Sequence, residues 1–151
     1  MKTNEFAVSA PRPEDKEGWR ILYDGYTVFY KRPINDGIAD TVWRWLHDPA
    51  HVLKGLLART TTGRVVGLAH YRPMPRPSAG AECGFLDDLF VAPEMRGNGV
   101  AGALFDALAE EARRRGWPLI RWLTADDNYQ ARTLYDRRAK RTMWITYQMD
   151  L

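Results

Sequence analysis

The stretch "FLDDLFVAPEMRGNGVAGALF", residues 85–105, decides the fold of this 151-residue chain. It changes from an apolar run, through a loop with three glycines, into a run of good helix formers. Residues 83–91 predict a strand, and residues 100–115 predict a helix that Gly116 and Pro118 end. Because another apolar run follows at 118–125, the order strand, loop, helix, strand indicates a right-handed crossover between parallel strands.

The predicted strand carries two adjacent aspartates inside an apolar run. Buried carboxylates without partners are costly, so the pair needs an explanation. Either one acid lies at a solvated strand edge and the other is hydrogen-bonded, or at least one points into a site that handles cations or protons. Strict alternation predicts two faces: Phe85, Asp87, Leu89 and Val91 on one, and Leu86, Asp88 and Phe90 on the other.

The loop between strand and helix places Gly97, Gly99 and Gly102 in the pattern G-x-G-x-x-G, the fingerprint of dinucleotide-binding folds. In those folds the strand runs almost directly into the first glycine, whereas five residues separate Val91 from Gly97. A P-loop is excluded because the glycine loop is not followed by a lysine and a serine or threonine. Small residues and free N–H groups at a helix start suit a pyrophosphate, and Arg96 adds positive charge. The alternative is a glycine-rich helix start without a ligand.

Composition narrows the class of protein. Hydrophobic residues make up 45% and charged residues 27%, which is typical of a soluble globular domain and excludes a disordered chain. The sequence has no apolar run of membrane-spanning length, and its first residues are too polar for a secretory signal. Cys83 is the only cysteine, and the net charge is +3. We therefore expect a cytoplasmic protein without a nucleic-acid or membrane partner.

The rest of the chain alternates between helical and strand patterns. Residues 73–81, which contain three prolines, are expected to form a loop. The further helices are expected at residues 14–30, at 39–46, and from a capping box at Asp127–Gln130 to about Arg138. The further strands are expected at residues 5–10, 51–60, 64–72, 118–125 and 143–151.

These features resemble the GNAT superfamily, the GCN5-related N-acetyltransferases. Residues 96–101 match the signature R/Q-x-x-G-x-G/A, residues 85–105 resemble motif A, and "WLTADDNYQARTLYDR" at 122–137 resembles motif B. "LDDLFV" and the ending "RTMWITYQMDL" are most similar to the histone/polyamine and spermidine/spermine acetyltransferases. The common "LGF" after the last helix is replaced here by "RRAKRT". The resemblance implies an α/β (α+β) fold in one domain over residues 1–151, with a mixed sheet of six or seven strands and four helices, and a homodimer.

The resemblance also implies acetyl-CoA as co-substrate. In such enzymes the glycine loop binds the pyrophosphate and the preceding strand pairs with the pantetheine arm. Asn128 and Tyr135 lie seven residues apart, so they share one helix face, although Asn128 could also cap its helix and Tyr135 could also be a packing residue. The residues implied in acetyl-CoA binding are Leu89, Phe90, Val91, Arg96, Gly97, Asn98, Gly99, Val100, Ala101, Gly102, Asn128 and Tyr135.

The implied reaction is direct transfer of an acetyl group to a primary amine, with a small amine or polyamine as acceptor. Tyr135 is expected to protonate the departing thiolate, and Asp87 to accept the proton of the ammonium group. Tyr26 and Asp88 are expected to bind the acceptor with Asp87. The alternatives are a lysine acetyltransferase of proteins or peptides, a coenzyme A sensor without catalysis and, on the G-x-G-x-x-G pattern alone, a nicotinamide-dependent oxidoreductase. No Cys/His spacing suggests a metal, and His47, His51 and His70 are interpreted as structural.

Overall fold

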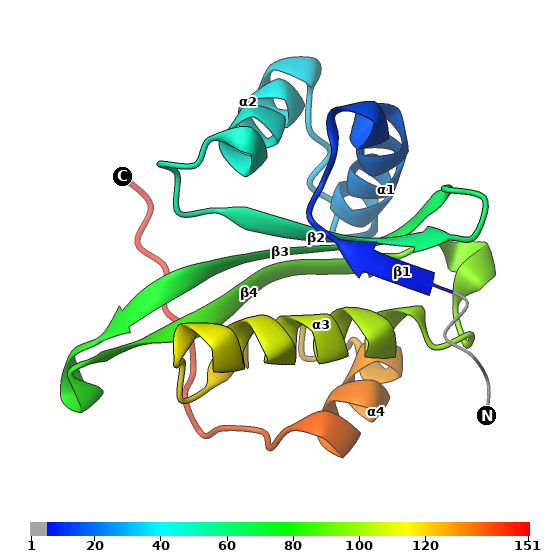
Figure 1. Ribbon diagram of the computed structural model, residues 1–151. Coiled ribbons are helices and arrows are strands. Elements are labelled where there is room, and N and C mark those ends of the chain that lie inside the picture. The colour runs from blue at the N-terminus through cyan, green and yellow to red at the C-terminus, as the bar shows by residue number, and fades with distance from the viewer. Residues whose placement is uncertain (1–5) are drawn as a thin grey trace.

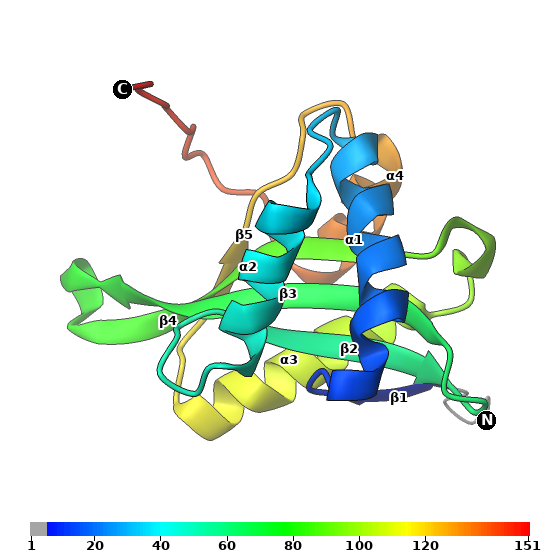
Figure 2. The ribbon, with the colours of Figure 1, turned by 90° about the horizontal axis from the view of Figure 1, so that it is seen from above.

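Two helices cover each face of a central β-sheet in the computed structural model, which describes residues 6–151 (Figure 1). On one face lie α1 (Lys16–Phe29) and α2 (Asp36–His47), and on the other lie α3 (Val100–Arg115) and α4 (Tyr129–Arg138). Figure 2 shows α1 and α2 side by side across the strands. A 3₁₀ turn at Pro13–Asp15 leads into α1, and proline suits the first position of a helical segment because its missing N–H needs no partner there.

The sheet has the strand order β1-β2-β3-β4-β5 and is antiparallel except for the parallel pair β4–β5. The predicted crossover through α3 is therefore confirmed. Residues 6–151 form five strands instead of the expected six or seven. Residue 5, predicted to begin the first strand, lies outside the described residues. The strands are β1 (Phe6–Ser9), β2 (Lys54–Thr60), β3 (Val65–Arg76), β4 (Ala81–Val91) and β5 (Ile120–Trp122).

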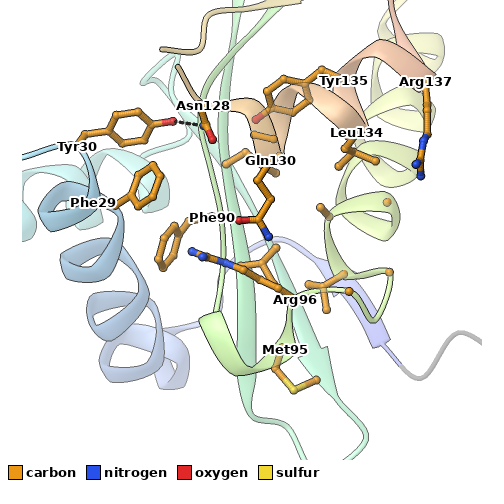
Figure 3. A pocket seen from close by; sticks show the side chains of 18 residues that line it. Phe29, Tyr30, Phe90, Met95, Arg96, Asn128, Gln130, Leu134, Tyr135 and Arg137 are labelled. Carbon is orange, nitrogen blue, oxygen red and sulfur yellow. Dashed lines mark hydrogen bonds between the residues drawn. The ribbon is translucent and has the colours of Figure 1, made fainter. Parts of the chain in front are cut away.

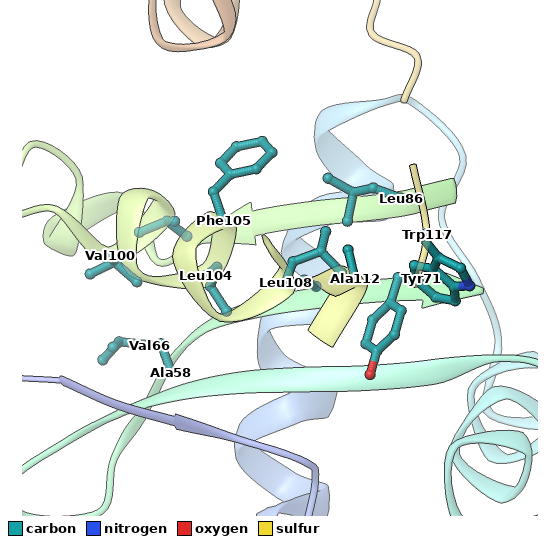
Figure 4. Close-up of a cluster of buried hydrophobic side chains, with 12 residues drawn as sticks. Ala58, Val66, Tyr71, Leu86, Val100, Leu104, Phe105, Leu108, Ala112 and Trp117 are labelled. Atoms are coloured by element: carbon teal, nitrogen blue, oxygen red, sulfur yellow. The ribbon is translucent and has the colours of Figure 1, made fainter. Parts of the chain in front are cut away.

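Helix α3 packs against the sheet through a cluster of buried hydrophobic side chains (Figure 4). Leu104 and Leu108 are almost completely buried, and each such side chain contributes about 1.5–3 kcal/mol through removal from water. Gly116 ends the helix in the left-handed conformation, with a φ of 71°. The buried face of α3 consists of Val100, Leu104, Phe105, Leu108 and Ala112.

The predicted alternation of β4 is wrong because the strand contains a β-bulge. His70 of β3 pairs with Asp88 and Tyr71 pairs with Leu86, so Asp87 is an extra residue on β4. The bulge reverses the side-chain order: Leu86, Leu89 and Val91 pack in the cluster under α3, whereas Phe90 packs under α1. An extra residue shifts the alternation by one position, and only the pairing with β3 shows where the shift lies.

Other details of the predicted elements also differ from the structure. Residues 73–76, expected in a loop, continue β3 and pair with β4. On the other edge of β3, the pairing with β2 ends at Tyr71, so the prolines of residues 73–76 interrupt no hydrogen bonds to β2. Strand β5 is only three residues long. Helix α4 begins at Tyr129, and its N-cap Asn128 makes no side-chain cap hydrogen bond, so the predicted capping box is wrong.

The expected last strand, residues 143–151, is not formed. This segment runs away from the body of the molecule (Figure 2), and its large apolar side chains are 74–96% exposed from Met143 to Met149. Period-two alternation favours a strand only where a neighbouring strand supplies hydrogen bonds. In this chain no neighbour for residues 143–151 occurs among residues 6–151.

Candidate active site

A pocket of about 390 Å³ opens between α1, the end of β4, the start of α3, and α4 (Figure 3). Its floor is β4, and the glycine loop forms one wall. Of the twelve residues expected to bind acetyl-CoA, all except Asn98 line this pocket. The Asn98 amide instead donates hydrogen bonds to the backbone carbonyls of Met95 and Arg96, both 3.2 Å away, so its side chain folds onto the loop.

The glycine loop exposes backbone where a bulky anion could approach. Gly97 and Gly99 have φ values of +78° and +85°, and a Cβ added at either would meet nothing within 4 Å. Gly99 is the N-cap of α3, and no side-chain cap hydrogen bond is present within the described residues. The first N–H groups of the helix, from Val100 to Gly102, therefore carry partial positive charge toward the pocket. Arg96 adds a full charge, with its guanidinium 5.4 Å from the Phe90 ring centroid.

Tyr135 and Asn128 lie at the opposite end of the pocket from the glycine loop (Figure 3). The Tyr135 ring packs edge-on against Phe105 and Trp122, and its hydroxyl points into the pocket. Burial raises the pKa of Tyr135 to about 12, with a smaller effect of Tyr30. Asn128 donates hydrogen bonds of 3.2 Å to the hydroxyls of Tyr30 and Thr124. The ring of Tyr135 is thus a packing group, while its hydroxyl is free to face the pocket.

The two aspartates lie beside the pocket, at the bulge that precedes Leu89. Arg72 Nε donates to both carboxylate oxygens of Asp87, at 3.2 and 3.1 Å. Burial raises the pKa of Asp87, and the Arg72 charge opposes that rise. Asp88 is 2.8 Å from His70 Nδ1. Tyr26 from α1 extends the aromatic wall toward the pocket, because its ring contacts both Tyr30 and Phe90.

Sequence reasoning missed several residues of this region. Gln130, Leu134 and Arg137 line the pocket at the spacing i, i+4, i+7 on α4, a signal that a helical projection could have found. Arg72 and His70 had no such signal, because their pairing with the aspartates depends on the bulge in β4. His47 and His51 bond backbone groups close in sequence, which agrees with their structural interpretation.

Comparison with known proteins explains why these elements occur together. Residues 19–139 match the Acetyltransferase (GNAT) family. The chain belongs to this family. It is 31% identical to the D-amino-acid N-acetyltransferase HPA3 of Saccharomyces cerevisiae over 149 residues, 98% of this chain and 92% of that protein. It is also 36% identical over 70 residues to the thialysine N-epsilon-acetyltransferase of Caenorhabditis elegans, 43% of this chain and 44% of that one. This GNAT protein is accordingly an N-acetyltransferase that acts on amines.

A solved structure shows the same fold. The aminoglycoside acetyltransferase AAC(6')-Iy, in complex with a bisubstrate analogue of CoA and acetylneamine, superposes with a TM-score of 0.81 at 17% identity, covering 97% of this chain and 98% of that one. The GNAT family uses acetyl-CoA as acetyl donor. Within residues 6–151, no helix is long and apolar enough to cross a membrane. The same residues contain no group of three or more His, Cys, Asp or Glu side chains that could hold a metal ion.

Proposed function

We propose that this GNAT protein transfers the acetyl group of acetyl-CoA directly to the primary amine of a small molecule or polyamine. The observation that carries the proposal is the layout of β4. Its end beside the glycine loop suits a pyrophosphate, and its bulge presents two carboxylates next to aromatic side chains of α1. Donor and acceptor would therefore meet along a single strand.

Acetyl-CoA, when bound, supplies the activated acetyl thioester. The open glycine loop fits its pyrophosphate, with the N–H groups of Val100, Ala101 and Gly102 and the charge of Arg96 as the binding groups. The segment Leu89–Val91 would pair with the pantetheine arm. A backbone N–H of that segment would stabilise the negative charge that develops on the thioester oxygen.

Asp87 and Tyr135 would move the protons. Asp87 accepts one proton from the ammonium group through water, which leaves a neutral amine. The nitrogen then bonds to the acetyl carbon, the carbon–sulfur bond breaks, and Tyr135 donates its proton to the sulfur. The second proton lost by the nitrogen returns to Tyr135 through water. With a pKa of about 12, Tyr135 carries its proton throughout the neutral range.

Tyr26, Asp87 and Asp88 favour a cationic acceptor, because carboxylates pair with ammonium groups and aromatic faces attract them. The names of the yeast and nematode relatives, which refer to D-amino acids and thialysine, also concern primary amines. A lysine of a protein or peptide is the second candidate acceptor. A coenzyme A sensor without catalysis is disfavoured by the acidic pair at the bulge and the Tyr135 hydroxyl in the pocket.

The test is a coenzyme A thiol-release assay with a panel of a polyamine, a D-amino acid, thialysine, an aminoglycoside and a lysine peptide. We expect release with at least one of the four small amines and a lower kcat/KM with the peptide. Release with the peptide alone would overturn the small-amine assignment. Binding of acetyl-CoA without any release would favour the sensor.

The protein is further proposed to be a cytoplasmic homodimer without nucleic-acid or membrane partners. The exposed segment 143–151 supports the dimer, because alternating apolar side chains of that kind are normally covered by another surface. Light scattering after gel filtration tests it. The intact chain should have the mass of a dimer, and a chain ending at residue 142 should be monomeric. A monomeric intact chain would contradict the proposal.

A further inference from the structure

A chain of hydrogen bonds runs from the core to the bulge of β4. Trp19 Nε1 of α1 donates to His70 Nε2 of β3 at 2.9 Å, and His70 Nδ1 is 2.8 Å from Asp88 Oδ2 of β4. Trp19 and His70 are 0% and 1% exposed. Helix α1 lies on the face opposite α3 (Figure 1) and crosses β3 and β4 (Figure 2), which is how the three side chains meet.

These two hydrogen bonds fix the position of the proton on the His70 ring. The indole N–H can only donate, so His70 Nε2 must accept and cannot carry a proton. The neutral ring then carries its proton on Nδ1 and donates it to Asp88. Both ring nitrogens are thus committed, and the Asp88 carboxylate is held from one side by a rigid, buried donor.

Asp88, the last residue in this series of hydrogen bonds, is not enclosed in the core as Trp19 and His70 are. The Asp88 side chain is 18% exposed and precedes Leu89, which lines the pocket. β-Bulges next to active sites change the direction in which side chains point, and the bulge at Asp87 places Asp88 on the face of the sheet that α1 covers. Arg72 already binds the neighbouring Asp87 carboxylate through both oxygens. Asp88 is therefore the better placed of the two to receive an external cation.

The surroundings of Asp88 also suit a cation. The hydroxyl-bearing rings of Tyr23 and Tyr26 lie on the same face of the sheet, and Tyr23 packs edge-on against His70 at 5.0 Å. Burial, followed by the Asp88 charge, raises the pKa of both tyrosines, so both stay neutral. The carboxylate therefore lies in a poorly solvated, electron-rich surrounding that would strengthen its attraction for an ammonium group.

We propose that His70 is a positioning residue, which orients the Asp88 carboxylate toward the acceptor amine. The proposal rests on the proposed acetyl transfer to an amine. It separates the roles of the two aspartates: Asp87 accepts the proton, and Asp88 holds the amine. It also gives His70, interpreted from the sequence as structural, a part in acceptor recognition.

Two substitutions of His70 separate positioning from packing. The amide nitrogen of an asparagine reaches the position of Nδ1, so His70→Asn keeps a donor for Asp88 but loses the acceptor for Trp19. The amide of a glutamine reaches the position of Nε2, so His70→Gln keeps the acceptor for Trp19 but loses the donor for Asp88. Steady-state kinetics with the best amine of the panel, and thermal unfolding, are measured for both variants and for Asp88→Asn.

We expect His70→Gln to raise the KM for the amine by about 10-fold, the size of one hydrogen bond to a charged group, with the KM for acetyl-CoA unchanged. His70→Asn should keep an amine KM close to that of wild type even though its unfolding temperature falls. Adding His70→Gln to Asp88→Asn should have little further effect on the amine KM, because His70 acts only through the Asp88 carboxylate. An unchanged amine KM in His70→Gln, or equal losses in the two variants, would overturn the proposal.

A measurement that needs no activity separates this proposal from the proposed function. Nitrogen-15 NMR of the histidine rings should show His70 protonated at Nδ1 and not at Nε2, and Asp88→Asn should shift that Nδ1 signal. The opposite tautomer would overturn the positioning role whatever the enzyme acetylates. If the tautomer is as expected but no amine is acetylated, the proposed function is wrong and the anchoring role of Asp88 is wrong with it.

Discussion

Asn128 of the loop before α4 donates a hydrogen bond to the hydroxyl of Tyr30, which lies 98 residues earlier at the end of α1 (Figure 3). Both residues line the pocket, so the bond joins the helix layers on opposite faces of the sheet across the proposed acetyl-CoA site. A second bond from the same amide, to Thr124, fixes its orientation. Asn128 therefore holds the pocket in shape and does not cap its helix.

Replacing Gly99 tests the glycine loop. The side chain in Gly99→Val would occupy open space where a phosphate is expected, at a φ of +85° that strains any branched residue. Gly63→Val is the matched control, because Gly63 has a φ of +86°, also faces open space, and lies in the turn between β2 and β3. We expect similar losses of unfolding free energy, about 1–3 kcal/mol.

Only Gly99→Val should weaken acetyl-CoA binding, by about 10-fold or more, since hydrogen bonds to a charged phosphate would be lost. Isothermal titration calorimetry measures both affinities. Equal acetyl-CoA affinities for the two variants would exclude the loop as the pyrophosphate site.

Replacing Tyr135 tests the proton donor. Tyr135→Phe keeps the ring that packs against Phe105 and Trp122 but removes the hydroxyl. Turnover should fall by about 10-fold or more, with acetyl-CoA affinity close to that of wild type. Because the pKa of Tyr135 is raised to about 12, the hydroxyl stays protonated in the neutral range. The ratio of wild-type to variant kcat should therefore be constant from about pH 6 to about pH 9. Equal kcat values would make Tyr135 a packing residue only.

Replacing Asp87 tests the proton acceptor. Asp87 can accept a proton only when its side chain is ionised. Wild-type kcat/KM for the amine should therefore rise as the pH increases through the raised pKa of Asp87. Asp87→Asn should lower kcat/KM and lack this rise, while acetyl-CoA affinity stays nearly intact. Asp126→Asn is the control, because that acid is 96% exposed and does not line the pocket. A variant whose pH profile matches that of wild type would contradict the role of Asp87.

The buried pair of Asp15 and Arg59 predicts a pH dependence of stability. Arg59 Nη2 is 2.5 Å from Asp15 Oδ2, and this hydrogen bond lowers the pKa of Asp15 in the folded state. The pair therefore stabilises the fold above the unfolded pKa of about 3.9, and its contribution is lost as the pH falls through the lower folded value.

Asp15→Asn should lower the free energy of unfolding by about 3 kcal/mol at neutral pH, since it leaves a buried charge unpaired. The difference from wild type should shrink in acid, as urea unfolding at several pH values would show. Glu110→Gln, which removes an exposed pair with Arg113, should cost less than about 1 kcal/mol. A difference for Asp15→Asn that does not change with pH would contradict this account.

Local patterns predicted the elements around the site well. The amphipathic stripe of residues 100–115, ended by Gly116, gave α3 with both boundaries, because a helix is specified by its own periodicity and caps. The glycine loop and the shared face of Asn128 and Tyr135 followed from equally local spacing. These elements hold most of the residues that line the pocket.

What the sequence could not predict depends on pairing between distant segments. The bulge at Asp87 is defined only by the register against β3, and it decides which faces Asp88 and Leu86 take. The contacts of His70 with Trp19 and Asp88 span 51 and 18 residues and have no local signal. Residues 143–151 have a strand pattern, but forming a strand needs a neighbour that the pattern does not identify.

The most direct test of the central claim is mass spectrometry of both enzyme and amine after incubation with acetyl-CoA carrying an isotope-labelled acetyl group. We predict that the label appears on the primary amine, that the enzyme gains no acetyl group, and that Gly99→Val slows the transfer while Gly63→Val does not. Label retained on the enzyme, or no labelled amine from any member of the panel, would contradict direct transfer from acetyl-CoA held in this pocket.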